Sequence, residues 1–136
     1  MRILLVSLFV AFTLYSCSES QPLDKATPVF TEVHKKGPET RRTLKLEIEG
    51  MMCEVGCASK IKKELLEQEA VSSVIIDFDK ERETDYAIVE YDPKGNTELN
   101  IYNCVNMIAD GKLYDVIKVE TIYYKEDILK WEQSLT

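Results

Sequence analysis

Apolar residues between Thr43 and Tyr123 change their spacing in a fixed order, and that order restricts the fold. They alternate with polar residues from Thr43 to Glu49, as in a strand with one buried face, and recur at helical spacing from Cys57 to Glu69. Two more strand-like stretches, a second helical stretch and a last β-rich stretch follow, over 71–78, 86–91, 97–111 and 113–123. This order predicts an α+β fold of the ferredoxin-like type, a βαββαβ sandwich whose antiparallel sheet carries two helices on one face.

The second predicted helix has recognisable ends. Thr97 follows a turn-forming stretch rich in Asp, Pro, Gly and Asn, and threonine is a favoured N-cap residue. Gly111 comes just after the last apolar residue of the helical pattern, where glycine commonly ends a helix. We therefore expect one helix between these two residues.

The first residues of the chain are typical of an export signal. MRILLVSLFVAFTLYSC carries one positive charge, at Arg2, and then an apolar run too short for the roughly 20 residues of a membrane-spanning helix. The residues before Cys17 resemble the lipobox of bacterial lipoproteins, in which the cysteine is lipidated after cleavage; an ordinary cleaved signal with a chance cysteine is the alternative. We expect a signal peptide at 1–16 and a protein anchored by Cys17 in the bacterial cell envelope, on the periplasmic or cell-surface side.

The segment after Cys17 lacks any apolar periodicity. Residues 18–42 hold three prolines and many polar side chains, which favours a flexible tether, and His34 is expected to be a solvated residue within it. The predicted organisation is therefore a signal peptide at 1–16, a lipidated cysteine and tether at 17–42, one folded domain at 43–124, and a short tail or helix at 125–136.

Charge and composition exclude two classes of function. The formal net charge is −7, whereas nucleic-acid binding requires a basic surface, so no nucleic-acid partner is expected. The only histidine, His34, falls in the predicted tether, and there is neither a Ser/His/Asp set nor a glycine-rich phosphate loop. We do not expect an enzyme.

The cysteines point to a metal. With Cys17 assigned to lipid, Cys53, Cys57 and Cys104 remain, and an odd number leaves at least one thiol unpaired within the monomer. Cys53 and Cys57 lie where the first strand gives way to the first helix, and the positive end of a helix favours the thiolate form that binds metals. Thiolates select soft ions such as Cu(I) and Zn(II). Two cysteines cannot close a four-coordinate zinc site, so Cu(I) is favoured.

The same stretch resembles the heavy-metal-associated domain of copper chaperones, metal-pumping ATPases and mercury-binding periplasmic proteins, whose pattern is Gly-Met-x-Cys-x-x-Cys. Gly50-Met51-Met52-Cys53 matches its left flank, and the right flank and later positions match at residues Cys57, Ile61, Leu65, Val71, Val74, Ile76, Asp77, Val89, Tyr91, Asp92, Pro93, Ile108 and Gly111. The likeness covers about 43–120, but three residues, 54–56, separate the cysteines where the family has two. If the helix begins early enough to include both cysteines, side chains four positions apart on it are close enough to share an ion. If Cys53 stays in the loop, we expect Gly56 to absorb the extra residue through backbone angles that other residues avoid.

The resemblance implies that Cys53 and Cys57 bind a soft ion for sequestration or for transfer to a partner, such as a metal transporter or another metal-binding domain. Cu(I) is favoured, and Zn, Hg, Ag and Cd are also compatible. Two alternatives remain: a thiol–disulfide redox protein that uses the CxxxC pair, and a metal-free interaction module.

Four further residues are expected either to pack in the core or to assist the metal site. Met51 is expected in the core, and Met52 either in the core or as a thioether ligand of Cu(I). Cys104 lies on the apolar stripe of the second helix, which favours a buried free cysteine over a third ligand. Lys112 resembles the lysine of eukaryotic-type copper chaperones, which implies that its charge offsets the anionic site; a solvated loop lysine is the alternative.

Overall fold

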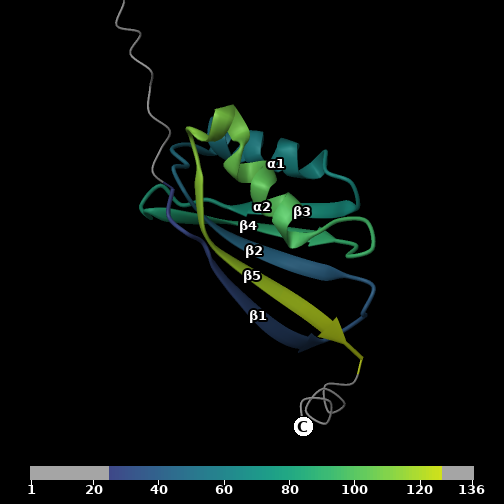
Figure 1. The fold of residues 1–136 in the computed structure, drawn as a ribbon. Coiled ribbons are helices and arrows are strands. Elements are labelled where there is room, and N and C mark those ends of the chain that lie inside the picture. Colours follow the sequence, from purple (N-terminus) through teal and green to yellow (C-terminus); the bar gives the residue numbers. More distant parts are fainter. Residues whose placement is uncertain (1–24, 127–136) are drawn as a thin grey trace, which may run out of the picture.

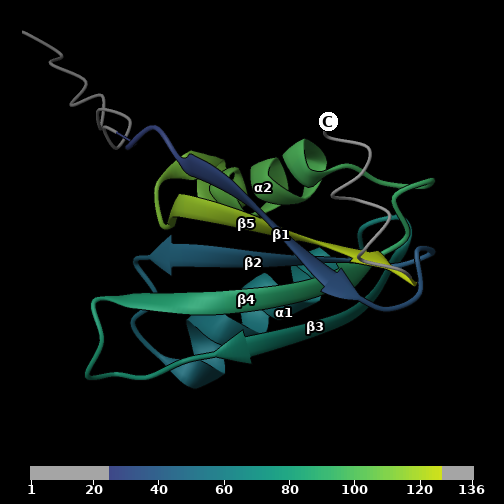
Figure 2. The ribbon, with the colours of Figure 1, turned by 90° about the horizontal axis from the view of Figure 1, so that it is seen from below.

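A computed structural model describes residues 25–126 and has one five-stranded sheet with two helices on one of its faces (Figures 1 and 2). The strand order in the sheet is β1-β5-β2-β4-β3. In chain order the elements are β1 (Val29–Lys36), β2 (Arg42–Glu49), η1 (Glu54–Ala58), α1 (Ser59–Leu66), β3 (Val71–Asp77), β4 (Thr84–Tyr91), α2 (Glu98–Asn106), η2 (Ile108–Gly111) and β5 (Asp115–Lys125).

The four strands β2 to β5, with α1 and α2, have the predicted ferredoxin-like order, and their three pairings are antiparallel. The core lies between sheet and helices. The alternating residues Leu44, Leu46 and Ile48 of β2 are fully buried there, as their spacing predicts. The helices bury one stripe each, which includes Ile61 from α1 and Ile101 from α2. Burying each such side chain contributes on the order of 1.5–3 kcal/mol.

The expectation that residues 17–42 form only a tether is wrong for 29–36, because this segment is strand β1. It pairs in parallel with β5 along its whole length, from Val29 opposite Lys118 to Lys36 opposite Lys125, so the complete sheet is mixed. His34 is therefore a strand residue, and its ring stacks on that of Tyr123 with centroids 5.3 Å apart. The strand lacks alternation because an edge strand has one neighbour and little of it is buried, so no single face had to be apolar.

The helix boundaries also differ from those expected. Thr97 is the N-cap of α2, as predicted, and its hydroxyl accepts a hydrogen bond from the backbone N–H of Asn100 at 3.2 Å. Gly111 does not end this helix, however. The helix ends at Asn106, and Gly111 closes the short turn η2 instead. The signal at Gly111 is real, since its φ of 75° is left-handed, but it belongs to that separate turn.

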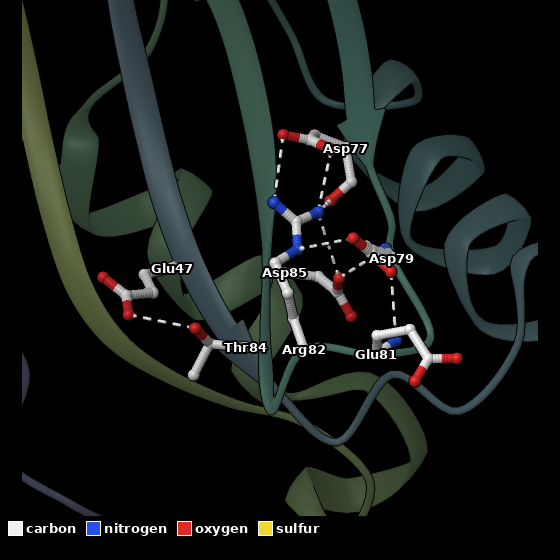
Figure 3. A network of polar contacts seen from close by, with 7 residues as sticks. All are labelled: Glu47, Asp77, Asp79, Glu81, Arg82, Thr84 and Asp85. Carbon is white, nitrogen blue, oxygen red and sulfur yellow. Dashed lines mark hydrogen bonds and ion pairs between the residues drawn. The ribbon is translucent and has the colours of Figure 1, made fainter.

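The turn between β3 and β4 is held by one arginine (Figure 3). A guanidinium nitrogen of Arg82 lies 2.8 Å from a carboxylate oxygen of Asp77 and 3.4 Å from a carboxylate oxygen of Asp85. Asp85 is only 1% exposed. The backbone N–H of Asp79 donates to the same oxygen of Asp85, at 2.8 Å. The arginine thus compensates a buried carboxylate at the end of the sheet where β2 terminates.

Three expectations lie outside the described residues: the signal peptide at 1–16, lipidation of Cys17, and any helix beyond Glu126. Within the part of the chain that the structure describes, no helix is long and apolar enough to cross a membrane.

Candidate metal centre

The two cysteines lie in the connection between β2 and α1, which begins with a sharp turn at Gly50. Gly50 has a φ of 96°, and a Cβ atom there would overlap the backbone carbonyl oxygen of Leu113. Glycine is required by both facts, because the left-handed region disfavours side chains and the space is already occupied. The connection after β2 is therefore packed directly against the loop that precedes β5.

Between the cysteines the chain makes a turn wider than an α-helical one. The backbone N–H of Ala58 donates to the carbonyl oxygen of Cys53 at 3.2 Å, and that of Ser59 donates to Glu54, both five residues back. Such i→i+5 bonds define a π-helical turn, which holds one residue more than an α-helical turn. The additional residue between the cysteines is accommodated in this turn, after which α1 continues with ordinary geometry.

The expected role of Gly56 is wrong in its mechanism. Among the described residues the glycines with positive φ are Gly50 and Gly111, so Gly56 does not use backbone angles reserved for glycine. Its missing side chain matters instead, because a Cβ atom on Gly56 would lie 2.9 Å from the Cys53 sulfur. Glycine leaves room for that sulfur to lie over the turn.

The turn brings the two sulfur atoms to 3.9 Å from each other. Cys53 is exposed and Cys57 is half-buried against the core, and neither is in a disulfide. Two thiolates that share one ion, with metal–sulfur bonds of about 2.3 Å, can be at most about 4.6 Å apart. The separation therefore permits both sulfurs to contact a single soft ion, one of them from the solvent side.

A buried tyrosine contacts the inner sulfur. The hydrogen bond from the hydroxyl of Tyr114 has the largest effect on Cys57 and lowers the pKa of its thiol; backbone hydrogen bonds from Met52 and Cys53 lower it further, against the opposing effect of burial. Tyr114 itself is 2% exposed, and burial followed by this hydrogen bond raises the pKa of its hydroxyl. The thiolate form of Cys57 is thus favoured mainly by a residue from the far end of the domain sequence.

Sequence reasoning missed Tyr114. In the sequence Tyr114 is one of several aromatic residues in the stretch predicted as the last strand. Its hydroxyl reaches the thiols only because the β2–α1 connection packs against the loop before β5. The position directly before a strand gave no signal for this, because the contact joins residues 57 positions apart in the chain.

The two methionines before Cys53 differ in their burial. Met51 packs against the core, as predicted. Met52 is 86% exposed and is not a core residue, so that half of its expectation is wrong. Val55, two residues after Cys53 in the chain, is 87% exposed, so an exposed apolar side chain stands in the sequence on each side of Cys53. Whether the Met52 thioether contacts a metal stays a prediction.

Cys104 does not join the pair. It is half-buried between the two helices, where its sulfur lies 3.6 Å from the carbonyl oxygen of Glu64, and burial raises the pKa of its thiol. Over residues 25–126 no group of three or more His, Cys, Asp or Glu side chains is arranged to hold a metal ion. Cys104 is a free cysteine packed against the core, as expected, but it is half-buried where the sequence predicted a buried residue. Lys112 lies exposed in the loop before Tyr114, and its role in offsetting charge stays a prediction.

Comparison with known proteins adds one similar structure. No protein-family profile matches the chain, and no curated protein matches it. Among solved structures, it is similar to the mercury-bound form of MerP, described as the periplasmic protein from the bacterial mercury detoxification system, with 26% sequence identity and a TM-score of 0.38. The match covers 55% of this chain and 97% of that one. The fold is assigned from the order of the elements and the pairing of the strands.

Proposed function

We propose that this chain is an exported heavy-metal-binding protein in which Cys53 and Cys57 together bind one soft ion. The observation that carries the proposal is the separation of 3.9 Å between two free thiols at the start of a helical segment. The hydrogen bond from Tyr114 supports it further, because thiolates, not thiols, bind metals.

Cu(I) is the favoured ion. Zinc in proteins prefers four ligands, whereas the described residues include no group of three or more His, Cys, Asp or Glu side chains that could hold a metal ion. Soft ions that accept few ligands suit such a site, and thiolates select them over magnesium or calcium. Hg, Ag, Cd and Zn are the competing ions that a titration has to include.

The bound ion would be sequestered or passed to another protein by thiolate exchange. The exposed sulfur of Cys53 supports transfer, because an incoming thiolate can reach the metal while Cys57 still holds it. A net charge of −7 favours a partner with a basic surface. A metal transporter or another metal-binding domain would be that partner.

Anchoring through a lipid on Cys17 belongs to the same proposal. Lys25, eight residues after Cys17, lies at the end of the domain that carries the thiols, since it donates to the carbonyl oxygen of Tyr114. Eight residues can span at most about 28 Å. A lipid on Cys17 would therefore keep the metal site close to the membrane surface, and Cys17→Ala should release the protein into the soluble fraction.

The deciding experiment is a titration of the reduced protein with Cu(I) in competition with a chelator. We expect one ion per chain, and loss of tight binding in both Cys53→Ala and Cys57→Ala. Cys104→Ser is the matched control, because its sulfur lies away from the pair, and it should bind as the unaltered protein does. Tight binding that survives both alanine variants would overturn the proposal.

A redox pair is the second candidate, favoured by the same distance. Sulfurs 3.9 Å apart need to approach to about 2.05 Å to form a disulfide, and the two thiols give up two electrons and two protons to an external thiol oxidant, which can reach the exposed Cys53. Weak metal binding together with a disulfide potential in the range of thiol oxidoreductases, about −270 to −120 mV, would support this candidate. If both assays are negative, a metal-free interaction module is what remains.

A further inference from the structure

The first described residues of the chain lie against the loop that carries Tyr114. The ammonium group of Lys25 donates to the carbonyl oxygens of Asn106, at 2.5 Å, and of Tyr114, at 3.0 Å. The backbone N–H of Ala26 donates to a carboxylate oxygen of Asp115 at 3.0 Å. These residues are 81 to 89 positions apart in the sequence. They meet because β1 runs parallel to β5, so both strands start at the same end of the sheet (Figure 2).

The loop that Lys25 contacts has an unfavourable backbone conformation. Ala109 and Asp110 have φ values of 52° and 56°, in the left-handed region that non-glycine residues avoid. Two such residues in succession persist only where surrounding contacts fix them. Lys25 bonds to a residue on each side of this stretch, Asn106 before it and Tyr114 after it.

We infer that Lys25 is a positioning residue for the candidate metal centre. It bridges the carbonyl oxygens of Asn106 and Tyr114, and this bridge holds the Tyr114 hydroxyl against the Cys57 sulfur. The bridge acts on the backbone of the same residue whose side chain reaches the thiol, so no further residue has to transmit the effect. The inference rests on the proposed function, since the position of Tyr114 matters for a metal only if the thiols bind one.

The chemistry of lysine suits this bridge. An ammonium group has three donors, of which two point at carbonyl oxygens here. Burial lowers the pKa of Lys25 and the carboxylate of Asp115 opposes that shift, so the group is partly removed from water beside a negative charge. The backbone of the loop passes close by, since a Cβ atom added to Gly111 would lie 3.5 Å from the Lys25 nitrogen. Lys25 falls outside residues 43–120, over which the sequence resembles metal-binding domains.

A double-mutant cycle on Cu(I) affinity tests the inference in the reduced protein. Lys25→Met and Tyr114→Phe should each weaken Cu(I) binding about fivefold, the size expected for the loss of one net hydrogen bond. The double variant should bind no more weakly than Tyr114→Phe alone, because both changes remove the same contact. Lys25→Arg, which keeps the donors, should restore most of the affinity. The inference is overturned if Lys25→Met binds like the unaltered protein, or if it loses the same factor in the Tyr114→Phe background.

A matched control separates positioning from general stability. Phe30 of β1 packs edge-on against Tyr102 of α2, with ring centroids 5.9 Å apart, and does not contact the loop through any of the bonds above. Phe30→Ala should lower the melting temperature without changing Cu(I) affinity. Equal losses of affinity in Phe30→Ala and Lys25→Met would mean that the N-terminal arm acts only through stability, and would overturn the inference.

Amide hydrogen exchange in the metal-free protein keeps the test independent of metal binding. The N–H of Lys112 donates to Ala109, and that of Val116 to the side chain of Asn106 at 3.0 Å. Lys25→Met should accelerate exchange at both, and leave the amides of β3 and β4 unchanged. If the unaltered protein binds no soft metal, the proposed function fails while this readout still decides whether Lys25 fixes the loop. If Lys25→Met leaves the exchange of both amides unchanged, the inference about Lys25 is overturned.

Discussion

The backbone N–H of Ala58 donates to the carbonyl oxygen of Cys53 at 3.2 Å, five residues earlier in the chain. This bond lets three residues fit between two cysteines while both sulfurs stay on one side of the turn, 3.9 Å apart. The longer spacing is therefore a local change in helix width and leaves the convergence of the sulfurs intact.

Deleting Val55 should convert the π-helical turn to an α-helical one without harming the fold. Its side chain is 87% exposed, so the deletion removes no buried contact, and two residues between the cysteines restore an ordinary turn. We expect an unchanged circular-dichroism spectrum and Cu(I) binding within about tenfold of the starting affinity. Loss of the fold would show that the wide turn is needed for packing.

Gly56→Ala should separate metal affinity from stability. The new Cβ atom would meet the Cys53 sulfur at 2.9 Å and displace it, whereas alanine in a helical turn is up to about 1 kcal/mol more favourable than glycine. We expect Cu(I) affinity to fall about tenfold, with urea unfolding unchanged or shifted to higher concentration. Val55→Ala, in the same turn and exposed, is the control and should alter neither quantity. An unchanged affinity in Gly56→Ala would contradict the assigned role of this glycine.

Cys104 should be the slow thiol of the domain. Burial raises the pKa of Cys104, so less of it is thiolate near neutral pH, and it is half-buried whereas Cys53 is exposed. In the metal-free protein, iodoacetamide followed by peptide mass spectrometry should label Cys53 at least several-fold faster than Cys104. Comparable rates in the folded protein, together with unchanged far-UV spectra, would show that the half-buried position of Cys104 does not protect its thiol.

The contribution of Asp77 to stability should depend on pH. The hydrogen bond from Arg82 lowers the pKa of the Asp77 carboxyl below its usual value, because it favours the charged form. This stabilisation is present above the unfolded-state pKa of about 3.9 and is lost as the pH falls through the lower folded-state value. Asp77→Asn should lower the melting temperature by a few degrees near pH 7, and the difference from the unaltered protein should shrink toward about pH 2.

The control for this pH series is Lys80→Ala, which changes an exposed charge in the same turn. Its effect on melting temperature should be small at every pH, because exposed pairs contribute little. A difference for Asp77→Asn that grows as the pH falls would contradict the assigned ion pair.

Much of the fold follows from local pattern. The alternation of Leu44, Leu46 and Ile48 predicts a strand with one buried face, and the helical spacing of Ile61 and Leu65 predicts the face that α1 turns to the core. Thr97 predicts a helix start through its own side chain. These features depend on residues within one or two turns of each other, so they can be deduced from the sequence.

The edge strand and the surroundings of the thiols required the tertiary structure. Strand β1 has no alternating pattern because little of this edge strand is buried on either face, and its pairing with β5 joins segments that are distant in the chain. Two contacts join segments that are distant in the chain: Tyr114 contacts Cys57, and Lys25 contacts Tyr114.

The sequence by itself determined that two thiols stand together where a strand passes into a helical segment, because four positions of chain cannot separate them far. Only the tertiary structure decided which groups surround them. Hydrogen bonds across 57 and 89 positions depend on how sheet and loops pack, and no local periodicity encodes that packing.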